Sequence, residues 1–473
     1  MVFTHFERHD TEASICVPSF VGKMARIRHC SRRPANPSLG NVARVSKLSV
    51  GSWALYDLAN TIFSLNIISL YFSLWIVNDL GGRDSEFGIA SSMAMLGVLV
   101  TAPFLGALSD QTGKRMPYLI VTTAICVALT PFLGTTDRGL ALLLFVIAVY
   151  AYEAGVIFYD ALLPSVSTEA NRGRVGGFGI GIGYLGSYVG LAIGAITVAR
   201  MGSFEAKPAI FKLTALAFLV FALPCFFFVK ERGRADATRF GWRSIKGAAL
   251  QFPKTISLAG RYPGLPRFLI GRVFYTDAAN TIGVFMGVYL TNEIGFSEQQ
   301  VNLALAIGIT AAVLGGISIG FVVDRVGPRR TLHGLLGLWI FTVVLAVAVA
   351  LRLPSQLFWA VPPLYGFSLG GTWAADRPYL LRLAPPRYLG QFFGIYSMVG
   401  RFSAVLGPLI WSLIVDGLGL GRTAAVAFLG LMMIVAYLIL RPISDAPRVW
   451  GPDDLVPAFS HEARVAEHKA GTV

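Results

Sequence analysis

A carboxylate and an amide, spaced by three residues, occur twice inside apolar stretches of the sequence. Asp57 and Asn60 lie in Asp-Leu-Ala-Asn-Thr-Ile, in the first long apolar stretch, and Asp277 and Asn280 lie in Asp-Ala-Ala-Asn-Thr-Ile, in the seventh. Residues three apart share one face of a helix. Because an ionisable side chain inside lipid is costly, such groups normally face a protein interior or a watery cavity. The four residues are therefore candidates for contact with a substrate or an ion, and the alternative is a structural role in anchoring neighbouring helices.

A glutamate and an arginine near the middle of two other apolar stretches are further candidates. Glu153 lies within 140–163, where a buried carboxyl can load and release a proton, so we take it as the candidate proton site. Arg401 lies within 391–415 and can bind a substrate carboxylate in a bidentate fork, or it can neutralise Glu153. The alternative for Glu153 is a structural ion pair with Arg401 or Arg272.

The composition indicates that these residues sit in membrane helices. The chain has 473 residues, of which 55% are hydrophobic and 14% charged, and its mean hydropathy is +0.63. A helix needs about 20 apolar residues to span the hydrocarbon core. Twelve such segments can be drawn, at 51–77, 87–108, 117–134, 140–163, 176–199, 209–229, 268–290, 299–323, 332–351, 357–381, 391–415 and 423–440.

A polar and basic connection at 230–267 divides these segments into six plus six. We therefore expect an all-α membrane protein with twelve transmembrane helices in two pseudo-symmetric six-helix halves, at 51–229 and 268–440. We interpret residues 1–50 as a disordered basic cytoplasmic tail, with a translation start at Met24 as the alternative. Residues 441–473 are expected to form a second cytoplasmic tail.

Three motifs recur in the same order and at a nearly constant offset. The first is the Asp and Asn pair described above. In the second, Gly106, Asp110 and Gly113 recur as Gly320, Asp324 and Gly327, and in the third Asp160 recurs as Asp376. A duplicated six-helix unit is the plan of many secondary transporters, in which the substrate site lies between the repeats near the bilayer midplane.

The loop from Gly106 to Arg115 joins the second and third segments. Its glycines permit close approach and a tight turn, Asp110 can sit at a helix terminus or pair with a base, and Lys114 and Arg115 can pair with acids. The loop resembles the signature loop of the major facilitator superfamily, G-x-x-x-D-[RK]-x-G-[RK]-[RK], although Gln111 replaces a base. The second copy matches at Gly320, Asp324, Arg325, Gly327 and Arg329, and Pro328 replaces a base there.

This resemblance implies the major facilitator fold and a gate at the cytoplasmic end. Ion pairs between the loops and nearby helix ends would hold that gate shut while the cavity opens outward. The alternative is that these are helix-end charges solvated by lipid headgroups. The candidate gating residues are Asp110, Lys114, Arg115, Asp160, Asp324, Arg329 and Asp376, with Arg377 beside Asp376.

Three further stretches resemble the vacuole-effluxer, or autophagy-related permease-like, branch of the superfamily. They are Trp53-Ala-Leu-Tyr-Asp-Leu-Ala-Asn60, Tyr159-Asp-Ala-Leu-Leu-Pro164, and Gly173-Arg-Val-Gly-Gly-Phe-Gly179 with Gly183-Tyr-Leu-Gly186. The resemblance implies export of small solutes, which are amino acids in the fungal members.

A glycine stripe runs along the fifth segment. Its members, at spacings of three and four, are Gly179, Gly183, Gly186, Gly190 and Gly194. Small residues let membrane helices approach closely, so we predict that this stripe packs on a helix of the other half.

The positive charges predict the orientation and exclude other classes of protein. Most of the 40 Lys and Arg residues fall in the tails and on one side of the segments. That side is therefore cytoplasmic, and both termini lie inside. Because the basic excess is a topology signal, no nucleic-acid partner is expected. The sequence holds no P-loop, no H-E-x-x-H and no C-x-x-C pair, so we expect no enzyme, cofactor or metal site.

The sequence thus predicts a secondary active transporter in the cell (inner) membrane. It would move a small polar solute, in particular amino acids in the efflux direction, by alternating access coupled to a proton or another ion. We expect a monomer in contact with the lipid bilayer. The alternatives are a sugar or drug exporter, a uniporter, a lipid translocator and a non-transporting receptor.

Overall fold

The computed structural model describes residues 46–231, 241, 245–248, 257–444, 446, 448 and 450. The predicted tail at 1–50 lies outside this range up to residue 45, as do most of the connection at 230–267 and most of 441–473. The secondary structure within the described range consists of helices.

The first half, as we call α1 to α8, contains six long helical spans within the described residues. The first span is not a uniform α-helix, because π-helical turns follow its initial part. The elements are α1 (Lys47–Phe63), η2 (Ser64–Tyr71), α2 (Phe72–Leu74), η3 (Trp75–Asp79), α3 (Asp84–Thr112), α4 (Met116–Leu129), η4 (Thr130–Gly134), α5 (Arg138–Ala161), α6 (Leu163–Val166), α7 (Arg172–Met201) and α8 (Ser203–Phe228).

The second half, α10 to α15, repeats the plan of six spans within the described residues. Its first span, α10, is a continuous α-helix, unlike its counterpart α1. The elements are α10 (Leu265–Asn292), α11 (Glu298–Val326), α12 (Pro328–Leu351), η5 (Ser355–Ala360), α13 (Val361–Leu383), η6 (Pro386–Tyr388), α14 (Leu389–Ser412), η7 (Leu413–Gly417) and α15 (Arg422–Leu440).

The predicted all-α architecture is confirmed, and the twelve predicted segments match these spans to within several residues at their ends. By length and composition, ten of the described spans are long and apolar enough to cross a membrane. The other two are α10 and α13. Both are long enough, but their buried charges lower their mean hydropathy: Arg272 and Asp277 on α10, and Asp376 on α13.

Local sequence signals account for several helix ends. Asp137 accepts a hydrogen bond from the backbone N–H of Leu140 and so caps α5. Ser297 and Gln300 form a reciprocal capping box at the start of α11. Gly113 ends α3 with a φ of 63°, a left-handed conformation that glycine adopts without strain, which is the tight turn expected of the loop.

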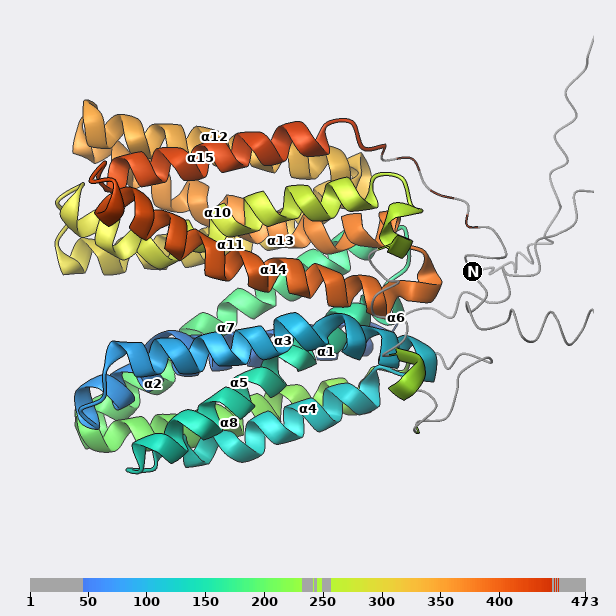
Figure 1. Cartoon of the computed structure of the whole chain (residues 1–473), viewed down its shortest axis with the longest axis horizontal. Helices are drawn as coiled ribbons and strands as arrows, with labels where there is room; N and C mark the ends of the chain where they lie inside the picture. The colour runs from blue at the N-terminus through green and yellow to red at the C-terminus, as the bar shows by residue number, and fades with distance from the viewer. Residues whose placement is uncertain are drawn as a thin grey trace, which may run out of the picture. The chain divides into compact units, whose positions relative to one another are not determined.

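Two helix pairs make the most extensive contacts between the halves. In Figure 1, α3 runs beside α14, and α7 reaches α11. Glycines permit this approach, since a Cβ atom on Gly106 would lie 2.1 Å from the carbonyl oxygen of Gly390, and one on Gly177 would lie 2.3 Å from that of Gly316. We call the end of the molecule that holds Asp110 and Asp324 the linker end, because Glu231 lies there.

The prediction for the glycine stripe on α7 is wrong. Gly179 faces Trp53, Gly183 faces Asp57, and Gly186 faces the backbone of Leu58, so the stripe packs on α1 of its own half. A second row on α7 meets α11 instead, and it consists of Gly173, Gly177 and Gly181. Residue spacing defines the face of a helix but does not identify the neighbour, and α7 is rich in glycine on both faces.

Candidate functional site

A polar cavity of about 340 Å³ lies between the two halves. Helices α1, α5 and α7 of the first half and α13 and α14 of the second half form its wall. Its lining residues are Asp57, Asn60, Thr61, Ser64, Tyr152, Glu153, Val156, Ile180, Gly183, Tyr184, Trp373, Arg377 and Arg401. Four of the six predicted substrate- or ion-binding residues are thus brought together: Asp57, Asn60, Glu153 and Arg401.

Glu153 and Arg401 form an ion pair across the cavity, from α5 to α14. The Glu153 side chain is 3% exposed and that of Arg401 is 26% exposed. Because Arg401 is the more open partner, a solute in the cavity can reach it. The Nε of Arg401 is buried and has no hydrogen-bond partner within the described part of the chain.

Asp57 and Asn60 lie on one face of α1, as their spacing predicts. The Asp57 carboxylate is 3.9 Å from Nη1 of Arg377, a distance that makes a weak ion pair. The Oδ1 atom of Asn60 is buried without a hydrogen-bond partner in the described residues.

Asp277 and Asn280 are placed differently. Neither is among the residues that line the cavity. Asp277 is fully buried, and Asn280 is half-buried on the same helix, α10. The sequence repeat is therefore not matched by a repeat of the environment.

Arg377, which the sequence places beside the candidate gating residue Asp376, also lines the cavity. Its Nε is 3.0 Å from a carboxylate oxygen of Asp160, so α13 is joined to α5 of the other half. Its guanidinium also lies over the ring of Tyr159, 5.7 Å from the centroid. One signal was available: the repeat mate of Arg377 is Ala161, so this base has no counterpart in the first half.

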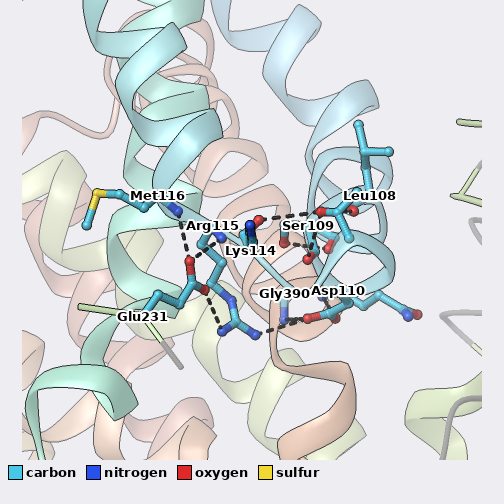
Figure 2. Close-up of polar contacts among 11 residues, drawn as sticks. Leu108, Ser109, Asp110, Lys114, Arg115, Met116, Glu231 and Gly390 are labelled. Atoms are coloured by element: carbon cyan, nitrogen blue, oxygen red, sulfur yellow. Dashed lines mark hydrogen bonds and ion pairs between the residues drawn. The ribbon is translucent and has the colours of Figure 1, made fainter. Parts of the chain in front are cut away.

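Asp110 contacts the start of a helix from the other half. Its two carboxylate oxygens accept hydrogen bonds of 2.9 Å from the backbone N–H groups of Gly390 and Gln391. These are the second and third residues of α14. The positive end of a helix dipole favours an anion at this place. Figure 2 shows the contacts of Asp110 with Gly390 and with the guanidinium group of Arg115.

Arg115 links Asp110 to the chain that leaves the first half. Its Nη2 is 3.1 Å from Asp110, and its Nη1 is 3.4 Å from Glu231. Glu231 also accepts hydrogen bonds from the backbone N–H groups of Arg115 and Met116, at 2.6 and 3.1 Å, and so caps α4 (Figure 2). The Lys114 side chain is exposed.

Asp324 repeats the Asp110 arrangement in the other direction. It accepts hydrogen bonds from the backbone N–H groups of Gly173, at 2.6 Å, and Arg174, at 3.0 Å, near the start of α7. The Arg174 side chain adds an ion pair of 2.8 Å. Arg329, unlike Arg115, donates to the carbonyl of Arg441 in its own half.

Asp376 lies inside the second half. It is fully buried, forms an ion pair with Arg272, and accepts hydrogen bonds from Tyr275, at 2.6 Å, and Tyr396, at 2.9 Å. Asp160 and Asp376 occupy corresponding positions in the repeat, but Asp160 pairs with an arginine of the other half and Asp376 with an arginine of its own half. Arg272 is engaged here, so the partner of Glu153 is Arg401 and not Arg272.

Comparisons with known proteins show the family of the chain. Residues 83–447 match the family described as vacuole effluxer Atg22 like. A Bacillus subtilis (strain 168) protein, named uncharacterized MFS-type transporter YxiO, is 25% identical over 414 residues, which cover 83% of this chain and 94% of that protein. Autophagy-related protein 22-1 of Penicillium rubens is 24% identical over 322 residues, 62% of this chain and 54% of that protein.

Solved structures show the same fold. The human organic anion transporter MFSD10 superposes with a TM-score of 0.65 at 17% identity, covering 84% of this chain and 99% of that one. A bacterial homologue of the iron transporter ferroportin gives 0.66 at 15% identity, with the same coverage. The predicted superfamily and branch are thus confirmed, and with them the expectation that the chain is not an enzyme. This multi-pass membrane protein, whose transported partner is a small-molecule solute, belongs to the Atg22-like vacuole effluxer family of major facilitator transporters.

Proposed function

We propose that the protein exports a small zwitterionic solute of the amino-acid class by proton-coupled alternating access. The observation that carries this proposal is the ion pair between Glu153 and Arg401 inside the polar cavity. The cavity presents both signs of charge, with carboxylates at Asp57 and Glu153 and guanidinium groups at Arg377 and Arg401. An amino acid, with one ammonium and one carboxylate, complements such a site.

Unsatisfied polar atoms support the same class of solute. The Nε of Arg401 and the Nη1 of Arg377 are buried donors without hydrogen-bond partners among the described residues, and Asn60 Oδ1 is an acceptor in the same condition. A solute that accepts at one end and donates at the other would satisfy both kinds of atom. Burying such atoms without partners is costly, about 1–3 kcal/mol each, so their satisfaction favours binding.

The coupling step is competition for Arg401. A solute carboxylate that binds the Arg401 guanidinium displaces Glu153, and the released carboxylate takes up a proton because its counter-charge is gone. When the solute leaves, Glu153 returns to Arg401 and releases that proton. Solute and proton are thereby bound and released together, so each solute that is exported carries a proton out with it.

The gate lies at the linker end, which we assign to the cytoplasm together with both termini. Asp110, Asp324 and the Asp160–Arg377 pair all join one half to the other there. At the opposite end, the described ion pairs Lys207–Asp79, Arg138–Glu86 and Arg422–Glu293 each stay within one half. This distribution fits a state closed toward the cytoplasm, in the cell membrane.

Uptake and counterflow in proteoliposomes test the proposal. Labelled amino acids, sugars and organic acids are offered with and without a pH gradient, to the wild type, to Glu153→Gln and to the control Glu86→Gln. Glu86 pairs with exposed Arg138 away from the cavity. We expect an amino acid to move and the gradient to accelerate it. Glu153→Gln should keep counterflow and lose the acceleration, and Glu86→Gln should match the wild type.

Other outcomes of this experiment would support one of the alternative functions. Movement of a sugar or an apolar compound alone would replace the amino-acid class with the exporter alternative. Movement that the gradient and Glu153→Gln leave unchanged would indicate a uniporter. No movement in a folded preparation would favour the lipid-translocator or receptor alternatives.

A further inference from the structure

Asp277 is a carboxylate inside a membrane-spanning helix for which the described residues provide no counter-charge. It is fully buried, at 0% exposure, near the middle of α10. Neither of its carboxylate oxygens has a well-formed hydrogen bond within the described part of the chain, and the backbone of Gly407 is the group that approaches them. An isolated ionised carboxylate in such a place is so costly that it neutralises instead.

The charged groups on the packed neighbours are engaged elsewhere. On α10 itself Arg272 is paired with Asp376, and on α14 Arg401 is paired with Glu153. On α13 Arg377 is paired with Asp160, and on α15 Arg422 is paired with Glu293. The remaining charges of the described parts of these helices and of α11 lie toward the linker end, and they are Arg267, Asp324, Arg325 and Arg382.

Asp57, which corresponds to Asp277 in the first half of the repeat, does have contacts. Asp57 has Arg377 within 3.9 Å, and Thr61, one turn later, donates its hydroxyl to the Asp57 carbonyl at 3.1 Å. In the second copy the Thr281 hydroxyl is buried without a partner among the described residues, like both oxygens of Asp277. The second copy therefore has three unsatisfied oxygens, whereas the matching acid and hydroxyl of the first copy each have a contact.

The Thr281 hydroxyl and one carboxylate oxygen of Asp277 lie beside Gly407 of α14. A Cβ atom built on Gly407 would lie 1.7 Å from the Thr281 hydroxyl and 2.8 Å from an oxygen of Asp277. Only a residue without a side chain leaves this space open. A proton on the carboxyl needs no added volume in this space.

We propose that Asp277 is a second cation site of the transporter and that it holds a proton in this state. The proton sits on one carboxylate oxygen and removes the uncompensated charge. Release to water would require α10 and α14 to separate at Gly407. The protonation stands on this geometry alone, and its use in the transport cycle rests on the proposed function.

Infrared spectroscopy of the purified protein in lipid tests the assignment without a transport assay. We expect a carbonyl-stretch band of a protonated carboxyl group in the wild type, and its loss in Asp277→Asn. Asp376→Asn is the control, since Asp376 is held ionised by Arg272 and its substitution should leave the band intact. Gly407→Ala should weaken the band at the same pH, because the added methyl group separates α10 from α14 and admits water.

Thermal unfolding supplies the second measurement. Because asparagine matches a neutral aspartic acid in shape and charge, Asp277→Asn should melt close to the wild type, whereas Asp376→Asn should melt well below it. A band that persists in Asp277→Asn, or a large loss of stability in that variant, would overturn the assignment. So would a sodium-dependent rise in melting temperature that Asp277→Asn abolishes, since the site would then hold sodium.

The two proposals fail separately. If the band behaves as expected and no solute moves, the proposed function fails while the protonated Asp277 stands. If an amino acid moves with proton coupling and the band is absent, the reverse holds.

Discussion

Asp110 and Asp324, which are repeat mates in the sequence, each bind the second and third backbone N–H groups of a helix from the opposite half. Asp110 at the end of α3 binds the start of α14, and Asp324 near the end of α11 binds the start of α7. The two contacts are therefore reciprocal, since each half supplies one acid and one helix start. Both lie at the linker end and join the two halves there.

Neutralising either acid should open the linker end. Hydrogen bonds to a charged group contribute about 1.5–3 kcal/mol, against about 0.5–1.5 kcal/mol for neutral ones. Asp110→Asn or Asp324→Asn should thus shift the ratio of closed to open molecules about tenfold. Spin-label distances between the halves would measure this ratio.

Asp137→Asn is the matched control for those variants. Asp137 also caps a helix, through the N–H of Leu140 at 3.0 Å, but the contact lies within the first half. Its substitution should leave the distances between the halves unchanged. Equal shifts in all three variants would mean that capping in general, and not the link between halves, sets the ratio.

Glu231→Gln should lower stability without opening the linker end. Glu231 caps α4 in its own half, through the N–H groups of Arg115 and Met116. Loss of charge at a helix N-terminus costs about 0.3–1 kcal/mol. A lower melting temperature with unchanged distances between the halves is the expected result, and a shift as large as that of Asp110→Asn would contradict it.

Arg377→Ala should be strongly destabilising, because it leaves the buried carboxylate of Asp160 without its cation. Breaking a buried ion pair from one side costs about 3–5 kcal/mol. The double variant Arg377→Ala with Asp160→Asn should recover part of that loss. Unfolding free energies of the two single variants and the double variant give the coupling, and simple additivity would show that the pair is not coupled.

A methyl group between α7 and α11 should prevent full closure of the linker end. In Gly177→Ala the new Cβ would lie 2.3 Å from the Gly316 carbonyl oxygen, so the helices must move apart. Gly51→Ala is the control, since a Cβ there meets nothing within 4 Å and favours its helix by about 0.5–1 kcal/mol. Transport rates and distances between the halves should change only in Gly177→Ala.

Sequence reasoning located the helices and the repeat, because hydrophobic length and recurring motifs are local signals. It paired Glu153 with either of two arginines, and only packing selects Arg401 over Arg272. It treated Asp57 and Asp277 as equivalents, although one faces Arg377 and the other faces Gly407. The environment of a residue depends on helices distant in sequence, so identical motifs gave no sign of this difference.

The same limit applies at the linker end. The acids of the loops were predicted to pair with bases, and Asp110 does contact Arg115. Its contacts with the other half, however, are backbone N–H groups, which every residue except proline carries and which therefore leave no mark in the sequence. The wrong prediction for the glycine stripe on α7 has a similar cause. Glycine permits a close helix contact, but its presence does not indicate which helix makes that contact.

The contacts of Asp110 and Asp324 with backbone N–H groups affect how this protein can be re-engineered. The backbone N–H groups of Gln391 and Arg174 bind the two acids, so the type of side chain does not decide these two hydrogen bonds, although the Arg174 side chain adds an ion pair to Asp324. Halves taken from two different relatives should still close on each other, provided that each brings its aspartate, its glycine contacts and a helix that begins in register. Chimeras of this kind would separate what the two halves contribute to solute selection.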